Sequence, residues 1–213
     1  MPATNAYGDD SGGEAGVATF ARYSGPSTGF GVFWYSFDVG NVHFVLWSSE
    51  HDYTPGSAQE AWLRADLLGV DRGVTPWLIV GMHRPMFNAR VDGDWSINVG
   101  MAANLEQLFV DAKVDLALSG HYHLYERTHS MRNYTVDATG RSPVYVTVGT
   151  GGATYHNETV RPDARAWSAF DASEWGFGVV ETFNCSALRF TFRANDDGGR
   201  VCDEAWIMRP ERA

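Results

Sequence analysis

The chain has 213 residues, of which 44% are hydrophobic and 20% are charged, and these proportions are typical of one globular domain with a substantial core. Its net charge of −10 argues against nucleic acid as a partner, because binding to a phosphate backbone relies on clustered Lys and Arg. No apolar run approaches the ~20 residues that span a bilayer, so no membrane-spanning segment is predicted. A small anionic substrate remains compatible with the charge, since a bound metal ion can dominate the local field.

The first half of the chain predicts two strands, a helix and a third strand. Residues 33–37 and 42–47 are rich in aromatic and β-branched residues and are separated by a turn. Ser57 and Glu60 form a capping box that predicts the start of a helix. The residues that this helix is expected to place on one face are Ala58, Ala61, Trp62, Ala65 and Leu68. Residues 77–82 form the next apolar strand.

The second half adds a helix, two buried strands and a meander. The helix is predicted at about residues 100–112, with an apolar face formed by Met101, Leu105, Leu108, Phe109 and Ala112. Strands are predicted at 115–119 and 144–148, and three more between about 177 and 208. Alternation of strands and helices predicts an α/β fold with at least partly parallel pairing.

Three histidines come directly after predicted strands. His83 follows the strand at 77–82, while His121 and His123 follow the strand at 115–119. The carboxyl ends of parallel strands form the usual site of an open α/β sheet, and imidazole is a ligand for zinc and iron. We therefore expect these histidines to bind metal, with Gly120 giving the backbone the freedom to turn sharply.

The other histidines carry weaker signals. His43 alternates inside a strand and is expected to be a satisfied sheet residue, while His51 and His129 lie in polar, exposed contexts. His156 follows the glycine-rich loop 149–152 and could face the same crevice. That loop could cradle an anion, although glycine turns after strands are common.

Taken together, these segments resemble the purple acid phosphatases, a family of the calcineurin-like metallophosphoesterase superfamily. Val80-Gly81-Met82-His83 matches the family's V-x-x-H motif, and Gly120-His121-Tyr122-His123 matches its G-H-x-H motif. The similarity continues through residues 33–36, 49–57, 75–79, 83–86, 113–115, 125–127 and 196–198.

The resemblance implies a metallophosphoesterase-type α/β sandwich in four layers, with mixed sheets and a dinuclear metal centre. The family pairs Fe(III) with a second metal, which is Zn, Mn or Fe. By this resemblance His83 and His121 would hold the divalent ion and His123 the iron. The two ions would clamp phosphoryl oxygens, activate a water and stabilise the leaving oxygen.

Only the last two of the family's five motif blocks occur in this sequence, so the motifs D-x-G, G-D-x-x-Y and G-N-H-D/E are missing. We therefore expect residues 1–213 to be the C-terminal portion of a catalytic domain whose N-terminal half is missing, ending in a β meander at about 177–208. The start fits this expectation, since residues 4–16 resemble a surface loop and no signal peptide precedes them. The proton donor is unassigned, with Asp92 or Asp94 as weak candidates.

The predicted function is acid phosphatase activity on small phosphorylated substrates, although the chain alone could be inactive. Two alternatives stay open: a phosphodiesterase or nucleotide pyrophosphatase of the same fold, and a non-catalytic remnant. Sequons at Asn133, Asn157 and Asn184 give a mild indication of a secreted or vacuolar glycoprotein. Cys185 and Cys202 could form a disulfide or remain free thiols.

Overall fold

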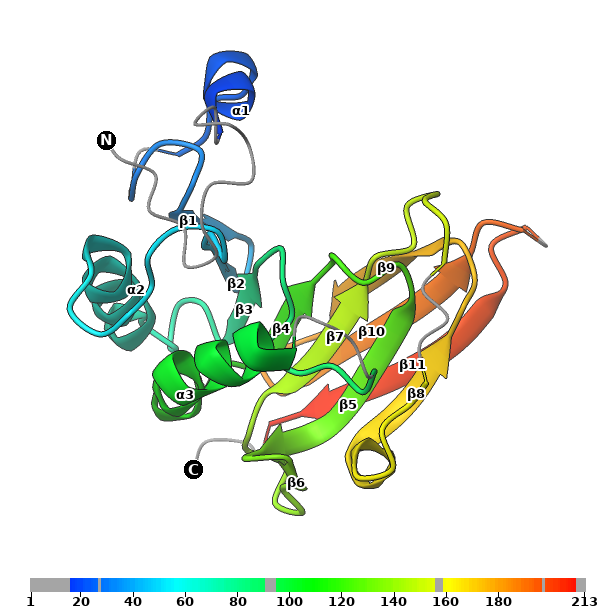
Figure 1. The fold of residues 1–213 in the computed structure, drawn as a ribbon. Helices are drawn as coiled ribbons and strands as arrows, with labels where there is room; N and C mark the ends of the chain where they lie inside the picture. The colour runs from blue at the N-terminus through cyan, green and yellow to red at the C-terminus, as the bar shows by residue number, and fades with distance from the viewer. Residues whose placement is uncertain (1–15, 27, 91–94, 156–158, 197, 210–213) are drawn as a thin grey trace.

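The computed structural model describes residues 16–26, 28–90, 95–155, 159–196 and 198–209. It is a mixed α/β fold, as predicted, with a helical layer on one side of a large sheet and a smaller sheet on the other (Figure 1). In chain order the elements are α1 Val17–Arg22, β1 Tyr35–Val39, β2 Val42–Leu46, α2 Ala58–Gly69, β3 Trp77–Gly81, α3 Trp95–Asp111, β4 Leu116–Ser119, β5 Tyr125–Arg132, β6 Thr135–Val136, β7 Val144–Val148, a 3-10 turn Ala164–Ala166, β8 Ser168–Ala172, β9 Gly176–Thr182, β10 Ala187–Ala194 and β11 Val201–Met208. None of the described helices is long and apolar enough to cross a membrane.

The large sheet has eight strands in the order β1-β2-β3-β4-β7-β5-β6, and β8 pairs with β5 outside this path. Strands β2, β3, β4 and β7 run parallel, while β1 and β5 pair antiparallel to their neighbours. The carboxyl ends of β3, β4 and β7 therefore lie at one edge of the sheet. This edge is where residues that follow those strands meet.

Alternate residues of β3 serve two separate cores. Leu78 and Val80 pack with α2 and α3, while Trp77 and Ile79 face the antiparallel sheet formed by β9, β10 and β11. All four side chains are fully buried. A strand covered on both faces reads as a continuous apolar run, which explains why the sequence predicted β3 within one residue of its observed bounds.

Helix α2 begins where predicted, because the Ser57 side chain accepts the backbone N–H of Glu60 at 3.2 Å. Its predicted buried face was wrong. The buried side chains are Gln59, Glu60, Leu63 and Leu67, whereas Leu68 is 53% exposed. Gln59 is buried because its amide bonds both the N–H and the C=O of Ser48, and this contact rotates the helix relative to the face counted from apolar residues.

Helix α3 buries the face that the sequence predicted, including Met101, Leu105 and Phe109. It begins at Trp95, whereas the sequence predicted a start at about residue 100. Strand β4 follows directly, so α3 serves as the crossover that makes β3 and β4 parallel.

The sequence did not predict β5 or β8. Strand β5 buries Tyr125, Glu126, Thr128 and Met131, so polar residues occupy part of its inward face. Strand β8 pairs with β5 and has no fully buried residue. Period-two hydrophobicity is therefore weak in both strands, which explains why they were missed.

The two cysteines are free thiols. Cys185 lies in the turn before β10, while Cys202 lies near the start of β11, whose other end pairs with Ala187. The stretch of β11 from Cys202 to Met208 covers about 20 Å. Bridged cysteines need Cα atoms within about 7 Å, so the arrangement excludes a disulfide between these two residues.

Candidate functional site

The structure brings His83 and His121 into contact at the carboxyl edge of the large sheet. The backbone N–H of Gly120 donates to the C=O of His83 at 3.0 Å, which ties together the segments that follow β3 and β4. The rings meet edge to face with centroids 5.0 Å apart. His121 Nδ1 lies 3.1 Å from His83 Nε2.

The turn that presents these rings differs from the one we expected. The left-handed residue is His121, with φ of 66°, and not Gly120. A side chain at Gly120 would meet nothing closer than the His83 carbonyl oxygen at 3.9 Å. A non-glycine residue rarely takes this conformation, and such residues cluster at functional sites.

Gly149 supports the same turn from the end of β7. A Cβ added there would lie 1.8 Å from the C=O oxygen of Tyr122, so the backbone of the histidine loop approaches β7 too closely for any side chain. Its N–H donates to the C=O of Leu124 at 3.1 Å. The glycine-rich loop was a candidate anion cradle, and Gly149 instead gives room to the histidine loop.

His123 is oriented by this neighbouring loop. Its Nδ1 lies 2.8 Å from the backbone oxygen of Thr154, so Nδ1 carries the proton and donates it. Histidines that bind metal usually donate their other ring N–H to a carbonyl or carboxylate in this way. The remaining nitrogen, Nε2, is therefore the one that could bind a metal ion.

Arg84 lies between His121 and the carboxylate of Glu50, in the loop that follows β2. Its Nε lies 3.0 and 3.3 Å from the two oxygens of Glu50, and its Nη1 lies 3.2 Å from His121 Nε2. A guanidinium only donates, so His121 Nε2 accepts and its Nδ1 carries the proton. The facing nitrogens of His121 and His83 thus share a single hydrogen bond, from Nδ1 to Nε2.

The Ser49 hydroxyl joins Glu50 to the backbone of Arg84. It donates to Glu50 at 3.0 Å and accepts the backbone N–H of Arg84 at 2.9 Å. The sequence did not single out Glu50 or Arg84 as functional residues. They lie 34 positions apart, and no local spacing links them.

Burial lowers the pKa of His83, and positive charge at His121 and Arg84 lowers this pKa further, although Glu50 raises it. The ring is therefore held in its neutral form at ordinary pH. Neutral imidazole is the form that binds metal.

The pair fits the geometry of one metal ion. Bonds of about 2.0–2.1 Å in a tetrahedral site place two ligand nitrogens about 3.3–3.4 Å apart, close to the 3.1 Å between His83 Nε2 and His121 Nδ1. Within the described part of the chain, no group of three or more His, Cys, Asp or Glu side chains is placed to hold a metal. A metal ion held by His83 and His121 would therefore need at least one further ligand.

The other predicted residues lie elsewhere. His43 is a satisfied sheet residue, as expected, with Nδ1 on Asp38 at 2.5 Å and Nε2 on Asp66 at 3.0 Å. His129 is exposed on β5. His51 is half-buried against the rings of Phe33 and Trp34, and burial lowers its pKa.

Several other sequence predictions fall outside the described residues. They are Asp92, Asp94, His156, Asn157 and most of the predicted N-terminal loop.

The model of the family described as iron/zinc purple acid phosphatase-like protein C matches residues 142–204. Purple acid phosphatase 18 of Arabidopsis thaliana is 37% identical over 82% of this chain and 40% of its own length. The structure of a purple acid phosphatase from seeds of yellow lupin, Lupinus luteus, superposes with a TM-score of 0.85 at 30% identity, over 99% of this chain and 39% of that one. The chain is similar over most of its length to a C-terminal part of the purple acid phosphatases.

One of the relatives has a name that describes it as inactive. Probable inactive purple acid phosphatase 27 of Arabidopsis thaliana is 33% identical over 96% of this chain and 35% of its own length. The chain thus spans about two fifths or less of the length of these relatives. The matched lupin structure confirms the predicted purple acid phosphatase fold over the whole chain.

Proposed function

We propose that the protein hydrolyses phosphate monoesters at a dinuclear metal centre to which this chain contributes His83, His121 and His123. The observation that carries the proposal is the 3.1 Å approach of His83 Nε2 to His121 Nδ1 at the carboxyl edge of the sheet. Similarity to acid phosphatases over most of the chain supports the reaction class.

The divalent ion would be held by His83 Nε2 and His121 Nδ1, and Fe(III) by His123 Nε2. Binding at His121 Nδ1 would move the ring proton to Nε2 and release the hydrogen bond that Nε2 accepts from Arg84. Bound together, two such ions polarise the phosphoryl oxygens and a water molecule for in-line displacement. We infer Zn, Mn or Fe as the divalent ion from the family alone. Further ligands must come from residues outside the described set, because one ion receives two of these nitrogens and the other receives one.

The chain's own residues prepare this centre in two ways. The lowered pKa of His83, caused first by burial, keeps its ring neutral. The Glu50–Arg84 pair lies against the His121 ring, and the Arg84 guanidinium adds a positive charge beside the place where a phosphate would bind. This local charge is compatible with a small phosphorylated substrate despite the overall charge of −10.

The proposal is tested by hydrolysis of p-nitrophenyl phosphate at mildly acidic pH, with iron and zinc supplied. We expect activity that His121→Ala abolishes and that His129→Ala, at an exposed histidine of β5, leaves unchanged. Loss of activity in both variants, or in neither, would overturn the assignment of the site.

The same assay with bis(p-nitrophenyl) phosphate separates the monoesterase from a phosphodiesterase of the same fold. We expect the monoester to be preferred. Stoichiometric metal binding without hydrolysis of either ester would support a non-catalytic protein, as the name of one relative suggests for that relative.

We also propose that the protein is secreted or vacuolar and is glycosylated. Among the described sequon residues, Asn133 and Asn184 are both exposed. Expression through a secretory pathway, followed by enzymatic removal of N-linked glycans, should reduce the apparent mass. Asn133→Gln and Asn184→Gln would assign any such loss to one position.

A further inference from the structure

A second cavity lies at the opposite edge of the large sheet and is independent of the proposed phosphatase site. This pocket has a volume of about 1150 Å³ and includes Pro76, Asp115 and Ser142, which precede β3, β4 and β7 respectively. The histidines follow the other ends of β3 and β4. Strand β3 alone separates the two edges by about 16 Å.

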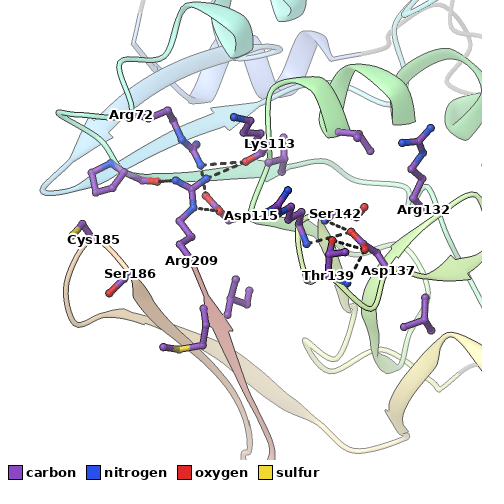
Figure 2. Close-up of a pocket in the computed structure, with 18 of the residues that line it drawn as sticks. Arg72, Lys113, Asp115, Arg132, Asp137, Thr139, Ser142, Cys185, Ser186 and Arg209 are labelled. Atoms are coloured by element: carbon purple, nitrogen blue, oxygen red, sulfur yellow. Dashed lines mark hydrogen bonds and ion pairs between the residues drawn. The ribbon is translucent and has the colours of Figure 1, made fainter. Parts of the chain in front are cut away.

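One wall of the pocket is a closed ionic cluster (Figure 2). The carboxylate of Asp115 accepts from Arg209 Nε at 2.5 Å, from Arg72 Nη2 at 2.7 Å and from the backbone N–H of Leu78 at 2.8 Å. Arg209 also donates to the C=O of Pro76 at 2.5 Å. The negative charge of Asp115 is therefore balanced by residues of the protein itself.

The opposite wall contains a second carboxylate that is also occupied (Figure 2). Asp137 accepts the Thr139 hydroxyl at 2.6 Å and the backbone N–H groups of Thr139 and Ser142 at 2.9 Å each. The bond from the Thr139 hydroxyl is the largest cause that holds the pKa of Asp137 well below its usual range. This carboxylate closes its own turn and stays ionised, so it offsets one of the positive charges that line the pocket.

Three further cations line the pocket without a hydrogen-bonded carboxylate, although the charge of Arg132 acts on the nearby carboxylate of Glu106. Lys113, Arg132 and Arg141 are exposed, and within the described residues none of their side chains donates a hydrogen bond. They come from three separate segments, after α3, at the end of β5 and before β7. Five cationic residues thus line a cavity that has two occupied carboxylates, in a protein whose net charge is −10.

The rest of the lining is mixed, with apolar side chains such as Val114, Val136 and Ile207 beside polar residues such as Thr135 and Ser186. Small-molecule sites combine such surface with a few convergent polar groups, in cavities of about 300–1000 Å³. Arg matches the fork of phosphate oxygens, and Lys adds a mobile point charge. Cations on separate segments suit a ligand with several charged groups.

We propose that this pocket binds a small, multiply charged phosphate compound through Lys113, Arg132 and Arg141, at a site distinct from the histidine site. The Arg72–Asp115–Arg209 cluster forms the rigid wall against which such a ligand would lie.

The test is calorimetric titration of sodium tripolyphosphate into the 213-residue chain at low salt, after metal is removed and the chelator is dialysed away. We expect binding that weakens about tenfold or more in the double variant Arg132→Gln, Arg141→Gln, since two charge-assisted contacts to the ligand are lost. Arg165→Gln, at an exposed arginine of the 3-10 turn, is the matched control and should bind as the parent chain does.

Two further arms make the outcome decisive. His121→Ala should leave tripolyphosphate binding unchanged, so failure of the phosphatase proposal and failure of this one can be told apart. Citrate should bind more weakly than tripolyphosphate. No binding to the metal-free chain, full binding by the double variant, or citrate binding of equal strength would each overturn the proposal.

Discussion

The two edges of the large sheet use charged and polar groups in opposite ways. At the amino edge, Asp115 is surrounded by two guanidinium groups and a backbone N–H, so its charge is balanced within the described chain. At the carboxyl edge, His83 and His121 direct two ring nitrogens at each other, and we propose that these nitrogens bind a metal ion. The first cluster is complete as it stands, whereas the second would become complete, by this proposal, when a metal ion is bound.

The largest expected effect is at the amino edge. Asp115→Ala would leave Arg72 and Arg209 buried or half-buried without their carboxylate, and removing one partner of such a group costs about 3–5 kcal/mol. Chemical denaturation should report this loss in the free energy of unfolding. Asp111→Ala, at an exposed carboxylate of α3, is the control and should cost less than about 1 kcal/mol.

The zinc affinity of the Asp115→Ala variant tests whether the two edges of the sheet are independent. Because the two edges are separated by the length of β3, folded Asp115→Ala protein should bind zinc as the parent chain does. A large loss of zinc affinity would contradict the independence of the Asp115 cluster from the histidine site.

Gly149→Ala should affect the carboxyl edge instead. The added Cβ would lie 1.8 Å from the backbone of Tyr122, so the histidine loop must move, at a cost of about 2–4 kcal/mol. We expect zinc affinity to fall together with the free energy of unfolding. Gly151→Ala meets nothing within 4 Å and should change stability by less than about 1 kcal/mol, and an equal loss in this control would refute the close-approach argument.

Glu126, on β5, predicts a pH dependence of stability. Burial is the main cause that raises its pKa from 4.5 to about 7, with Asp171 acting in the same direction and the Ala89 N–H and Arg90 opposing it. The folded state therefore binds the proton more tightly, so this contribution to stability is present below pH 4.5 and is lost as the pH rises through about 7. The loss at higher pH is about 3 kcal/mol.

Unfolding of Glu126→Gln across pH 4 to 8 checks this sign. The variant should lack that part of the fall, and its stability should exceed that of the parent above pH 7. Parallel curves for the two proteins would show that the carboxyl group does not titrate in this range.

The smallest expected effect is a change of tautomer. Arg84→Met removes the donor to His121 Nε2, so the ring proton should shift from Nδ1 towards Nε2. Nitrogen chemical shifts of the histidine rings report this directly. The His121 spectrum should be unchanged in Arg165→Met, and an unchanged spectrum in Arg84→Met would exclude the proposed orienting role.

The sequence predicted the elements in which hydrophobicity repeats at a single period. The bounds of β7 were predicted at Val144–Val148, and the predicted face of α3 is buried, because apolar side chains dominate both elements. The prediction for α3 missed Asn98 and Ala102, which are also buried. The buried face of α2 was wrong because Gln59 is inside, where it bonds the backbone of Ser48. A buried polar residue such as Gln59 does not show in the spacing of apolar residues from which a buried helix face is predicted.

The candidate site also contains residues that the sequence predicted and residues that it did not. Motif positions predicted His83, His121 and His123 as metal ligands, which stays a prediction, and strand order brings His83 and His121 to one edge. The Glu50–Arg84 pair and the close approach at Gly149 depend on contacts between distant segments, which no local pattern contains. Asp92 and Asp94 stay predictions as proton donors.

The most direct test of the central claim is a zinc titration of the chain with ¹⁵N-labelled histidine. The account predicts that His83 Nε2 and His121 Nδ1 change together with a single midpoint, while the ring of His129 stays constant. Separate midpoints for the two rings, or a shift at His121 Nε2 in place of Nδ1, would contradict a shared metal ion at this edge of the sheet.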